Sequence, residues 1–140
     1  MYKPNYRYLK SAEMDFPIAK GRFQLGETEY METLQHMTDV ESQLCLNQLC
    51  YVFFAQGVLE KRWEGLESLT FDKYLDLRKE GMLITESHKI FHHETISSEP
   101  FDGQIQLTKI KRRNNIYLAK LKFDLNEGAS VGNLSLVLRV

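Results

Sequence analysis

The segment from Gly26 to Leu59 constrains the fold more than any other part of this chain. It reads as a polar loop followed by a helix, and the helix begins at Thr38-Asp39-Val40-Glu41, which fits the S/T-x-x-E capping box. From Leu44 to Leu59 nearly every residue is apolar. A helix that is apolar on all sides has to be wrapped by other structure. We therefore predict one long buried helix from Thr38 to about Gln56.

Strand patterns occupy most of the remaining sequence. Before the helix, a Tyr-rich arm over residues 1–10 is followed by one expected strand from Met14 to Leu25, with Pro17 at an edge or a bulge. After the helix, alternation of apolar residues predicts four more strands. They cover Met82–Glu94, Phe101–Arg112, Ile116–Leu125 and Leu134–Val140. Arg113-Asn114-Asn115 is expected to form a hairpin turn, because Asn tolerates a positive φ.

A second, shorter helix is expected from Phe71 to Glu80, between the long helix and the last four strands. Thr70 is its expected N-cap, and Gly81 is expected to close it in the left-handed conformation. The order is then strand, long helix, short helix and four antiparallel strands. This order predicts an α+β protein with the hotdog fold, in which a curled antiparallel sheet wraps around one long helix.

Length and charge narrow the class of protein. The 140 residues suit a single domain over 1–140. A formal net charge of −1 excludes a chain-wide basic field that would attract nucleic acid. No signal segment and no apolar stretch of ~18 residues is visible, so we expect neither secretion nor a membrane span. Cys45 and Cys50 lie five residues apart on one predicted helix and point away from each other, which favours reduced thiols and a cytoplasmic location.

The start of the long helix is where we expect chemistry. Its unpaired N–H groups and positive dipole end can polarise a carbonyl and stabilise an oxyanion. The Tyr30 phenol can donate to the same oxygen, Thr38 or Glu41 can position water, and His36 is a candidate base. Each residue also has a structural explanation. Thr38 and Glu41 form the cap, Tyr30 can pack its ring under the loop, and His36 can close a local hydrogen bond.

Two further groups of polar residues are candidates for substrate binding. Asn47 and Gln48 interrupt the apolar helix and need hydrogen-bond partners. They either touch substrate or tie the helix to the sheet or to a second copy of the chain. Lys109, Lys111, Arg112 and Arg113 form the one basic cluster. It is either a solvated hairpin end or a contact for coenzyme A phosphates or an acidic carrier protein.

Metal and cofactor chemistry is not expected. His88 and His92 are four residues apart on a predicted strand, about 13 Å, which is too far for one metal ion. The P-loop, the dinucleotide fingerprint and the G-x-S-x-G motif are all missing. We therefore expect an enzyme without a metal or an organic cofactor.

Two motifs carry a resemblance to a known family. G-E-T-x-Y ends at Tyr30, and C-x-N-Q-L-x-Y follows on the long helix from Cys45 to Tyr51. Together with His36 and Val40-Glu41, these motifs resemble the FcoT family of hotdog long-chain fatty acyl thioesterases. A weaker likeness continues through Leu69–Tyr74 and Met82–Ile84.

The resemblance implies a set of catalytic residues, namely two tyrosines and an asparagine. The tyrosine of the G-E-T-x-Y motif falls on Tyr30. The asparagine position falls on Thr38, which keeps a hydrogen-bonding oxygen but lacks the amide donors. The other tyrosine belongs to the N-terminal arm, where Tyr2 is the nearest match with an offset of one residue.

The resemblance and the residues leave three functions open. The first is hydrolysis of a fatty acyl thioester of coenzyme A or of an acyl carrier protein, with the acyl tail between helix and sheet. The second is glycine addition to a 2-enoyl-acyl-carrier-protein, because members of this family in isonitrile lipopeptide clusters look like glycyltransferases. Because the sequence identifies no cation near Tyr30 for the glycine carboxylate, hydrolysis is favoured. The third is acyl-thioester binding without catalysis. In each case we expect a homodimer, or a higher homo-oligomer such as a hexamer, that pairs through the sheets.

Overall fold

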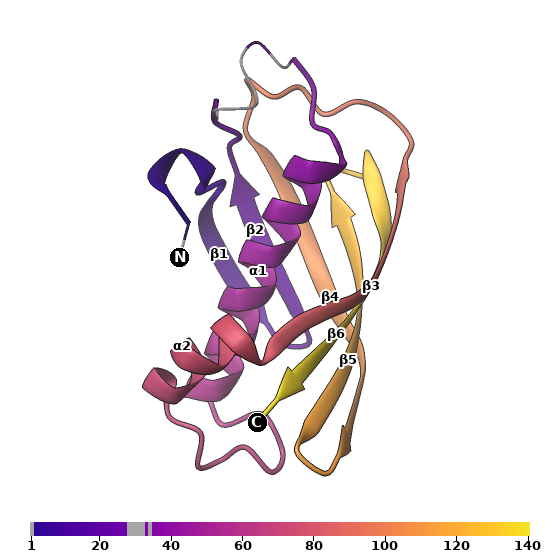
Figure 1. The fold of residues 1–140 in the computed structure, drawn as a ribbon. Helices are drawn as coiled ribbons and strands as arrows, with labels where there is room; N and C mark the ends of the chain where they lie inside the picture. Colours follow the sequence, from indigo (N-terminus) through magenta and orange to yellow (C-terminus); the bar gives the residue numbers. More distant parts are fainter. Residues whose placement is uncertain (1, 28–32, 34) are drawn as a thin grey trace.

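A computed structural model describes residues 2–27, 33 and 35–140, and shows a six-stranded antiparallel sheet curled around one long helix (Figure 1). The strand order is β1-β2-β4-β5-β6-β3, so β1 and β3 are the two edges. The elements are η1 (Pro4–Tyr6), β1 (Leu9–Asp15), β2 (Ile18–Phe23), α1 (Asp39–Leu59), α2 (Phe71–Glu80), β3 (Met82–Phe91), β4 (Phe101–Arg113), β5 (Ile116–Leu125) and β6 (Ser130–Arg139). The predicted α+β hotdog arrangement is confirmed. Among the described residues, no helix is long and apolar enough to cross a membrane.

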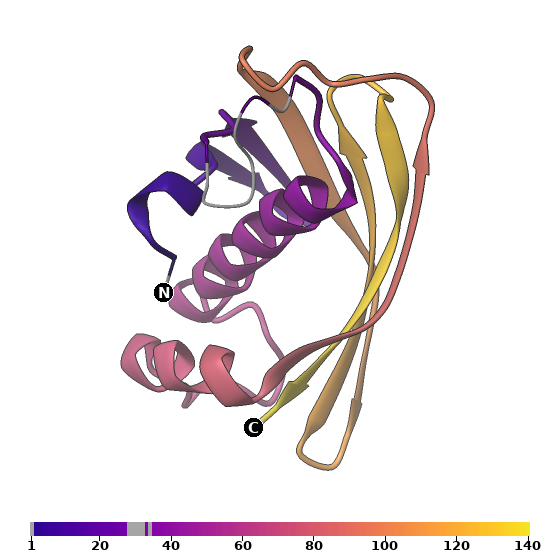
Figure 2. The same ribbon diagram turned by 45° about the horizontal axis from the view of Figure 1, so that its top comes forward.

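The core lies between α1 and the concave face of the sheet (Figure 2). Cys45, Leu46, Leu49 and Phe53 of α1 are buried in one cluster with residues of every strand except β3 and β1. The burial follows from the sequence, since these residues recur at helical spacing on one side of α1.

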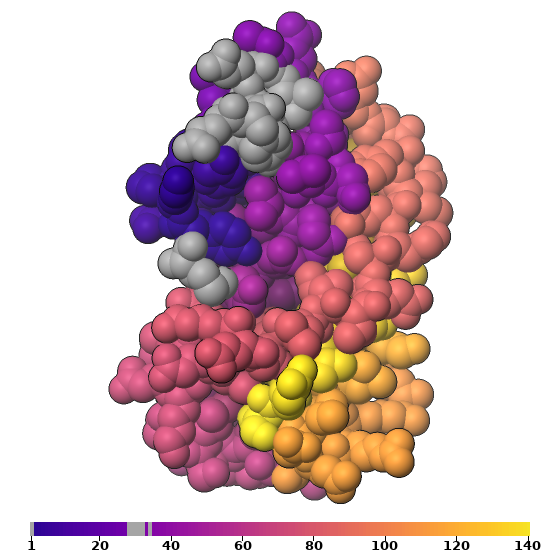
Figure 3. Space-filling model, viewed as in Figure 1, coloured from indigo at the N-terminus to yellow at the C-terminus, as the bar shows by residue number. Residues whose placement is uncertain are grey.

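The prediction that α1 is wrapped on all sides is wrong within one chain. Val40, Leu44, Asn47 and Tyr51 form an outer stripe on the side away from the sheet, and Val40 is 52% exposed. A single curled sheet covers one side of a helix only, which leaves the outer side of α1 between the N-terminal arm and β3 (Figure 3).

Two local predictions are also corrected. The single strand expected from Met14 to Leu25 is a hairpin of β1 and β2, with Phe16 and Pro17 in its turn. Proline suits the turn because it has no N–H for the ladder. Gly81 ends α2 with φ −105° rather than in the left-handed conformation. Its neighbours explain the glycine, because an added Cβ would lie 2.6 Å from the carbonyl oxygen of Arg139.

Candidate functional site

The start of α1 is fixed by the predicted capping box, which is confirmed. The Thr38 N–H donates to Oε2 of Glu41 at 2.7 Å, and the Thr38 hydroxyl donates to the same oxygen. Glu41 is only 1% exposed, so this carboxylate is held inside the protein beside the cap. The first-turn N–H groups, including those of Asp39 and Val40, have no intrahelical carbonyl partner. This end of α1 can therefore offer donors to a ligand oxygen.

The loop before the helix is held by the segment between β3 and β4. The Met37 N–H donates to the Thr95 carbonyl at 2.8 Å, and the Ser97 N–H donates to the Gln35 carbonyl at 3.0 Å. His36 sits between these bonds in a single antiparallel bridge, and its side chain is exposed. The residues just before the cap are thus anchored to the segment between β3 and β4. Tyr30, the leading catalytic candidate, lies outside the described residues.

A buried lysine that the sequence analysis missed lies at the first turn of α1. Nζ of Lys89, on β3, contacts Oδ1 of Asp39 at 2.9 Å and donates to Oε1 of Gln43 at 2.5 Å and to Oγ of Ser87 at 2.8 Å. The Lys89 side chain is only 8% exposed. No motif marks a lone lysine on a strand, so only the packing of β3 beside α1 reveals it. The site therefore contains a cation close to the helix start.

A second polar group joins the N-terminal arm to the two helices, and we call it the arm cluster: Tyr2, Asn47, Tyr51 and Arg78. The Tyr2 and Tyr51 rings are 6.5 Å apart, and Cζ of Arg78 lies 6.0 Å from the Tyr51 ring centroid. Burial raises the pKa of Tyr2 to about 12, while its hydrogen bond with Asn47 acts in the opposite direction. Burial also raises the pKa of Tyr51. Both phenols are therefore neutral hydrogen-bond donors near pH 7.

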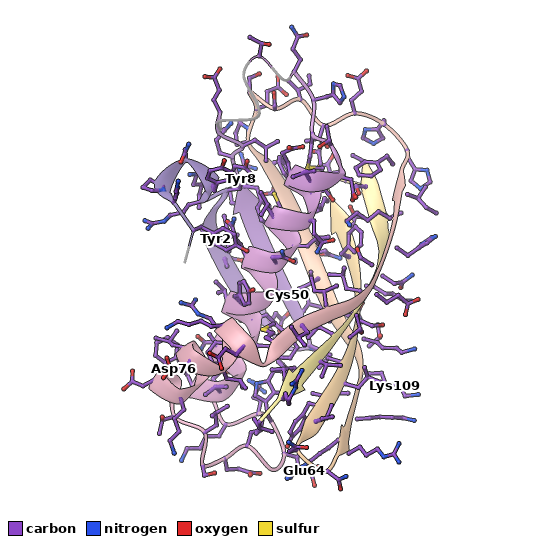
Figure 4. The ribbon with its side chains drawn as sticks, in the orientation of Figure 1. Tyr2, Tyr8, Cys50, Glu64, Asp76 and Lys109 are labelled. Atoms are coloured by element: carbon purple, nitrogen blue, oxygen red, sulfur yellow. The ribbon has the colours of Figure 1, made fainter. Side chains whose placement is uncertain are left out.

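The arm cluster is separate from the helix start. Asn47 follows Thr38 by nine positions, about 13 Å along the helix axis, and Tyr51 follows it by about 20 Å. Tyr2 therefore lies beside the middle of α1 rather than at the capped end (Figure 4). If Tyr2 acts on the substrate, it acts on a part remote from a carbonyl bound at the first turn.

Gln48 has a structural role that accounts for both ends of its amide. Its Oε1 accepts the Leu9 N–H at 3.0 Å, and its Nε2 donates to the Tyr6 carbonyl at 2.7 Å. The side chain is 7% exposed. This pair of bonds holds the N-terminal arm against α1. Of the two roles expected for Gln48, its contacts are those of a residue that ties the helix to the sheet and the arm.

The basic cluster lies at the other end of the molecule. Lys111, Arg112 and Arg113 are exposed at the end of the β4–β5 hairpin. The helix start is near the opposite end of α1, whose 21 residues span about 30 Å (Figure 1). Nε of Arg112 donates to the Asn114 carbonyl, and its guanidinium lies 5.5 Å from the Tyr117 ring centroid. One chain therefore does not bring the basic cluster to the capped end of α1.

The expected path of an acyl tail between helix and sheet is occupied by core side chains. Leu46 and Leu49 of α1, and Ile105 and Leu121 of the sheet, are fully buried there. A hollow of about 600 Å³ lies instead near the β4–β5 hairpin, and is lined by residues that include Phe16, Arg62, Trp63, Arg112 and Tyr117. A tail at the helix start would thus have to lie along an exposed surface or displace core residues.

The two cysteines belong to the core. Burial raises the pKa of Cys50 to about 12, and burial with the nearby Glu41 raises the pKa of Cys45. Both thiols are free and buried. Neither has the exposed, electropositive surroundings of a nucleophilic cysteine.

The chain is similar to one family of proteins along nearly its whole length. The chain matches the FcoT-like thioesterase domain over residues 1–138. It is 30% identical over 132 residues to the (2E)-enoyl-ACP glycyltransferase of Mycobacterium tuberculosis, which covers 90% of this chain and 72% of that protein. It is 28% identical over 116 residues to the enzyme of the same name from Streptomyces coeruleorubidus, with 80% and 70% covered.

Solved structures with low sequence identity share the fold. A hypothetical protein from Staphylococcus aureus in complex with CoA aligns with a TM-score of 0.55 at 13% identity, over 85% of this chain and 67% of that one. A thioesterase superfamily protein from Shewanella loihica aligns with a TM-score of 0.52 at 4% identity, over 99% and 96%. At these identities the likeness concerns the fold alone.

Proposed function

The chain belongs to the FcoT-like thioesterase family, and on that basis we propose that it hydrolyses a fatty acyl thioester of coenzyme A or of an acyl carrier protein. The observation that carries the proposal is the anchored start of α1. The capping box and the bonds of Gln35 and Met37 to the segment before β4 hold the first turn in place. Donors that are fixed before substrate arrives stabilise a developing oxyanion without reorganising during the reaction.

In the proposed reaction, the thioester carbonyl oxygen lies at the first turn of α1. It accepts hydrogen bonds from the N–H groups of Asp39 and Val40 and from the Tyr30 phenol. Water attacks the carbonyl carbon, the C–S bond breaks, and the products are a carboxylic acid and a thiol.

The capping box also supplies a route for the proton of the water. Because the Thr38 hydroxyl donates to Glu41, its oxygen can accept from the nucleophilic water. As water attacks, Thr38 takes the proton of the water and passes its own to Glu41, and this proton finally reaches the leaving thiolate. His36, which is exposed two residues before the cap, is the second candidate for proton exchange. This scheme gives threonine a use at the position where the family's asparagine is expected.

Replacing Tyr30 with Phe tests the hydrolytic proposal. Loss of one oxyanion donor typically lowers kcat by about 10²- to 10³-fold, and we expect a loss of that size. The measurement is thiol release from fatty acyl-CoA and from acyl carrier protein. Tyr117→Phe is the matched control, because that phenol donates to the Glu64 carbonyl at the far end of the molecule.

The control variant should keep wild-type turnover. Near-normal turnover by Tyr30→Phe would contradict the role of Tyr30. If wild-type protein binds acyl thioesters but releases thiol from none of them, the non-catalytic hypothesis replaces hydrolysis.

A second candidate function is glycine addition, and two observations favour it. The relatives at about 30% identity are named (2E)-enoyl-ACP glycyltransferases. Lys89 also supplies the cation that the sequence did not identify, beside the first turn of α1. In this reaction the glycine nitrogen bonds to C3 of the enoyl group and C2 gains a proton, while the thioester stays intact. The Lys89 ammonium would hold the glycine carboxylate in place of its contact with Asp39.

Mass spectrometry of a 2-enoyl-acyl-carrier-protein incubated with this protein and glycine separates the two reactions. Hydrolysis predicts loss of the acyl group, whether or not glycine is present. An added mass of one glycine on an intact thioester would reject simple hydrolysis. In that case Lys89→Met should raise the KM for glycine, while Lys79→Met, at a surface lysine of α2, should not.

We further propose that two copies pair through β3. This strand is a sheet edge, bonded to β6 on one side only among the described residues. It exposes four large apolar side chains to between 40 and 47%, namely Leu83, Ile84, Ile90 and Phe91. A long apolar edge strand is a template for pairing with another chain. A second copy at this edge would also extend the apolar surface beside Lys89, where an acyl tail can lie.

Sedimentation equilibrium tests the pairing. The expected mass is at least twice that of the 16.4 kDa chain. Ile90→Lys should shift the protein toward monomer, because it places a charge on the paired edge. Ile116→Lys, at an exposed apolar residue of the inner strand β5, should not. A wild-type protein that sediments as a monomer would overturn this proposal.

A further inference from the structure

Arg78 of α2 is a cation without an anionic partner among the described residues. Its guanidinium lies over the Tyr51 ring, and its Nε is buried with no hydrogen-bond partner in the part of the chain that the structure describes. The next residue, Lys79, differs, since its Nζ pairs with Asp76 at 3.4 Å. Burying part of a charge is costly unless a partner compensates it. A bound anion would complete the contacts of Arg78.

The residues around Arg78 are suited to an anion with several oxygens. Tyr51 and Tyr2 are neutral phenols, and both lie on the same side of α1 as the Asn47 carboxamide. These groups come from three separate elements, the N-terminal arm, α1 and α2. The arm is fixed by Gln48, and α2 is fixed by the Tyr74 phenol, which donates to the Tyr51 carbonyl at 2.7 Å. The cluster is therefore held in place by contacts that involve no ligand.

The distance from the helix start decides which anion fits. Tyr51 is about 20 Å along α1 from Thr38. The carboxylate of an attacking glycine cannot be the anion at Arg78. The glycine nitrogen has to lie about 3–3.5 Å from the carbon that it attacks, and the carboxylate is only two bonds further away. A phosphopantetheine arm has about thirteen bonds between phosphorus and sulfur and extends to roughly 15 Å, as four to five extended residues do. The rest of the distance between Thr38 and Tyr51 is covered by the bond from sulfur to the thioester carbon at one end and by the contact between phosphate and arginine at the other.

We infer that Arg78, together with Tyr51 and Tyr2, binds the phosphate of a phosphopantetheine thioester whose carbonyl lies at the start of α1. This inference rests on the proposed function for the position of the carbonyl. The phosphopantetheine chain lies along the outer stripe, where Val40 and Leu44 face its methylene groups and Asn47 faces its amides. Lys111 to Arg113 lie at the end of the β4–β5 hairpin of the sheet, whereas this phosphate lies between α2 and the N-terminal arm.

The phosphate is common to coenzyme A and to the prosthetic group of a carrier protein. Arg78 recognises the shared chemistry, so the two sources are separated by experiment. The site gives the residues of the N-terminal arm a role in holding substrate rather than in the chemical step. In particular, Tyr2 becomes a donor to the phosphate.

Calorimetric titration with 4′-phosphopantetheine and with pantetheine tests the inference. Wild-type protein should bind the phosphorylated compound about tenfold or more tightly, as expected for a hydrogen-bonded ion pair. Arg78→Gln should remove this difference and leave the affinity for pantetheine unchanged. Arg78→Lys should keep part of it, because lysine retains the charge but not the planar fork. Lys79→Gln is the matched control and should keep the full difference.

The outcomes separate this inference from the proposed function. Tyr30→Phe should lose turnover and keep the preference for phosphate, because binding is measured without reaction. A wild-type protein without that preference, or an Arg78→Gln variant that retains it, overturns the inference whatever the turnover. In turnover assays, Arg78→Gln should raise the KM relative to wild-type protein for acyl-CoA, for acyl carrier protein or for both, and the affected substrate identifies the source of the phosphate. An unchanged KM for both substrates rejects the site.

Discussion

Burial of one side of α1 in the concave sheet is the constraint on which the rest of the structure depends. Leu46, Leu49 and Phe53 are almost completely buried. Each side chain of this kind contributes about 1.5–3 kcal/mol by leaving water. Because this side of α1 is fixed, the capped end lies beside the segment before β4 and the outer stripe faces away from the sheet. Both proposed ligand contacts follow from that orientation.

Polar contacts then fix α1 along its length. Lys89 joins β3 to the first turn through Asp39 and Gln43, and Gln48 joins the N-terminal arm to the middle of the helix. Near the C-terminal half, the Tyr74 phenol of α2 donates to the Tyr51 carbonyl. These ties leave the first-turn N–H groups and Arg78 on a rigid support. Rigid support of this kind is what electrostatic catalysis and anion binding both require.

The sequence predicted those helices and strands that are specified by neighbouring residues. The capping box placed the start of α1, Thr70 placed the start of α2, and alternation placed most of β4 and β5. The edge strand β1 was missed, because most of its side chains are exposed and its apolar residues do not alternate. The exposure of the outer stripe was also missed, since apolar residues in a helix do not reveal how many layers cover it.

The site was predictable only in part, for a different reason. Thr38 and Glu41 could be placed because a cap is a feature of neighbouring residues. Lys89 and Arg78 could not, since each depends on a contact between elements far apart in the sequence. Asn47 was singled out as a polar residue that needs a partner, and its partners, Tyr2 in the arm and Gln43 one turn earlier in α1, emerged only from the fold. Single charged residues thus acquire a role through tertiary placement, which no motif records.

The central claim is that first-turn N–H groups of α1 bind the thioester carbonyl. The most direct measurement is the nuclear magnetic resonance of backbone amides while the protein is titrated with a ketone analogue of an acyl thioester, in which a methylene group replaces sulfur. We expect the amide protons of Asp39 and Val40 to move downfield and to exchange more slowly with solvent on binding. Saturation by the analogue with both amides unchanged would contradict this claim.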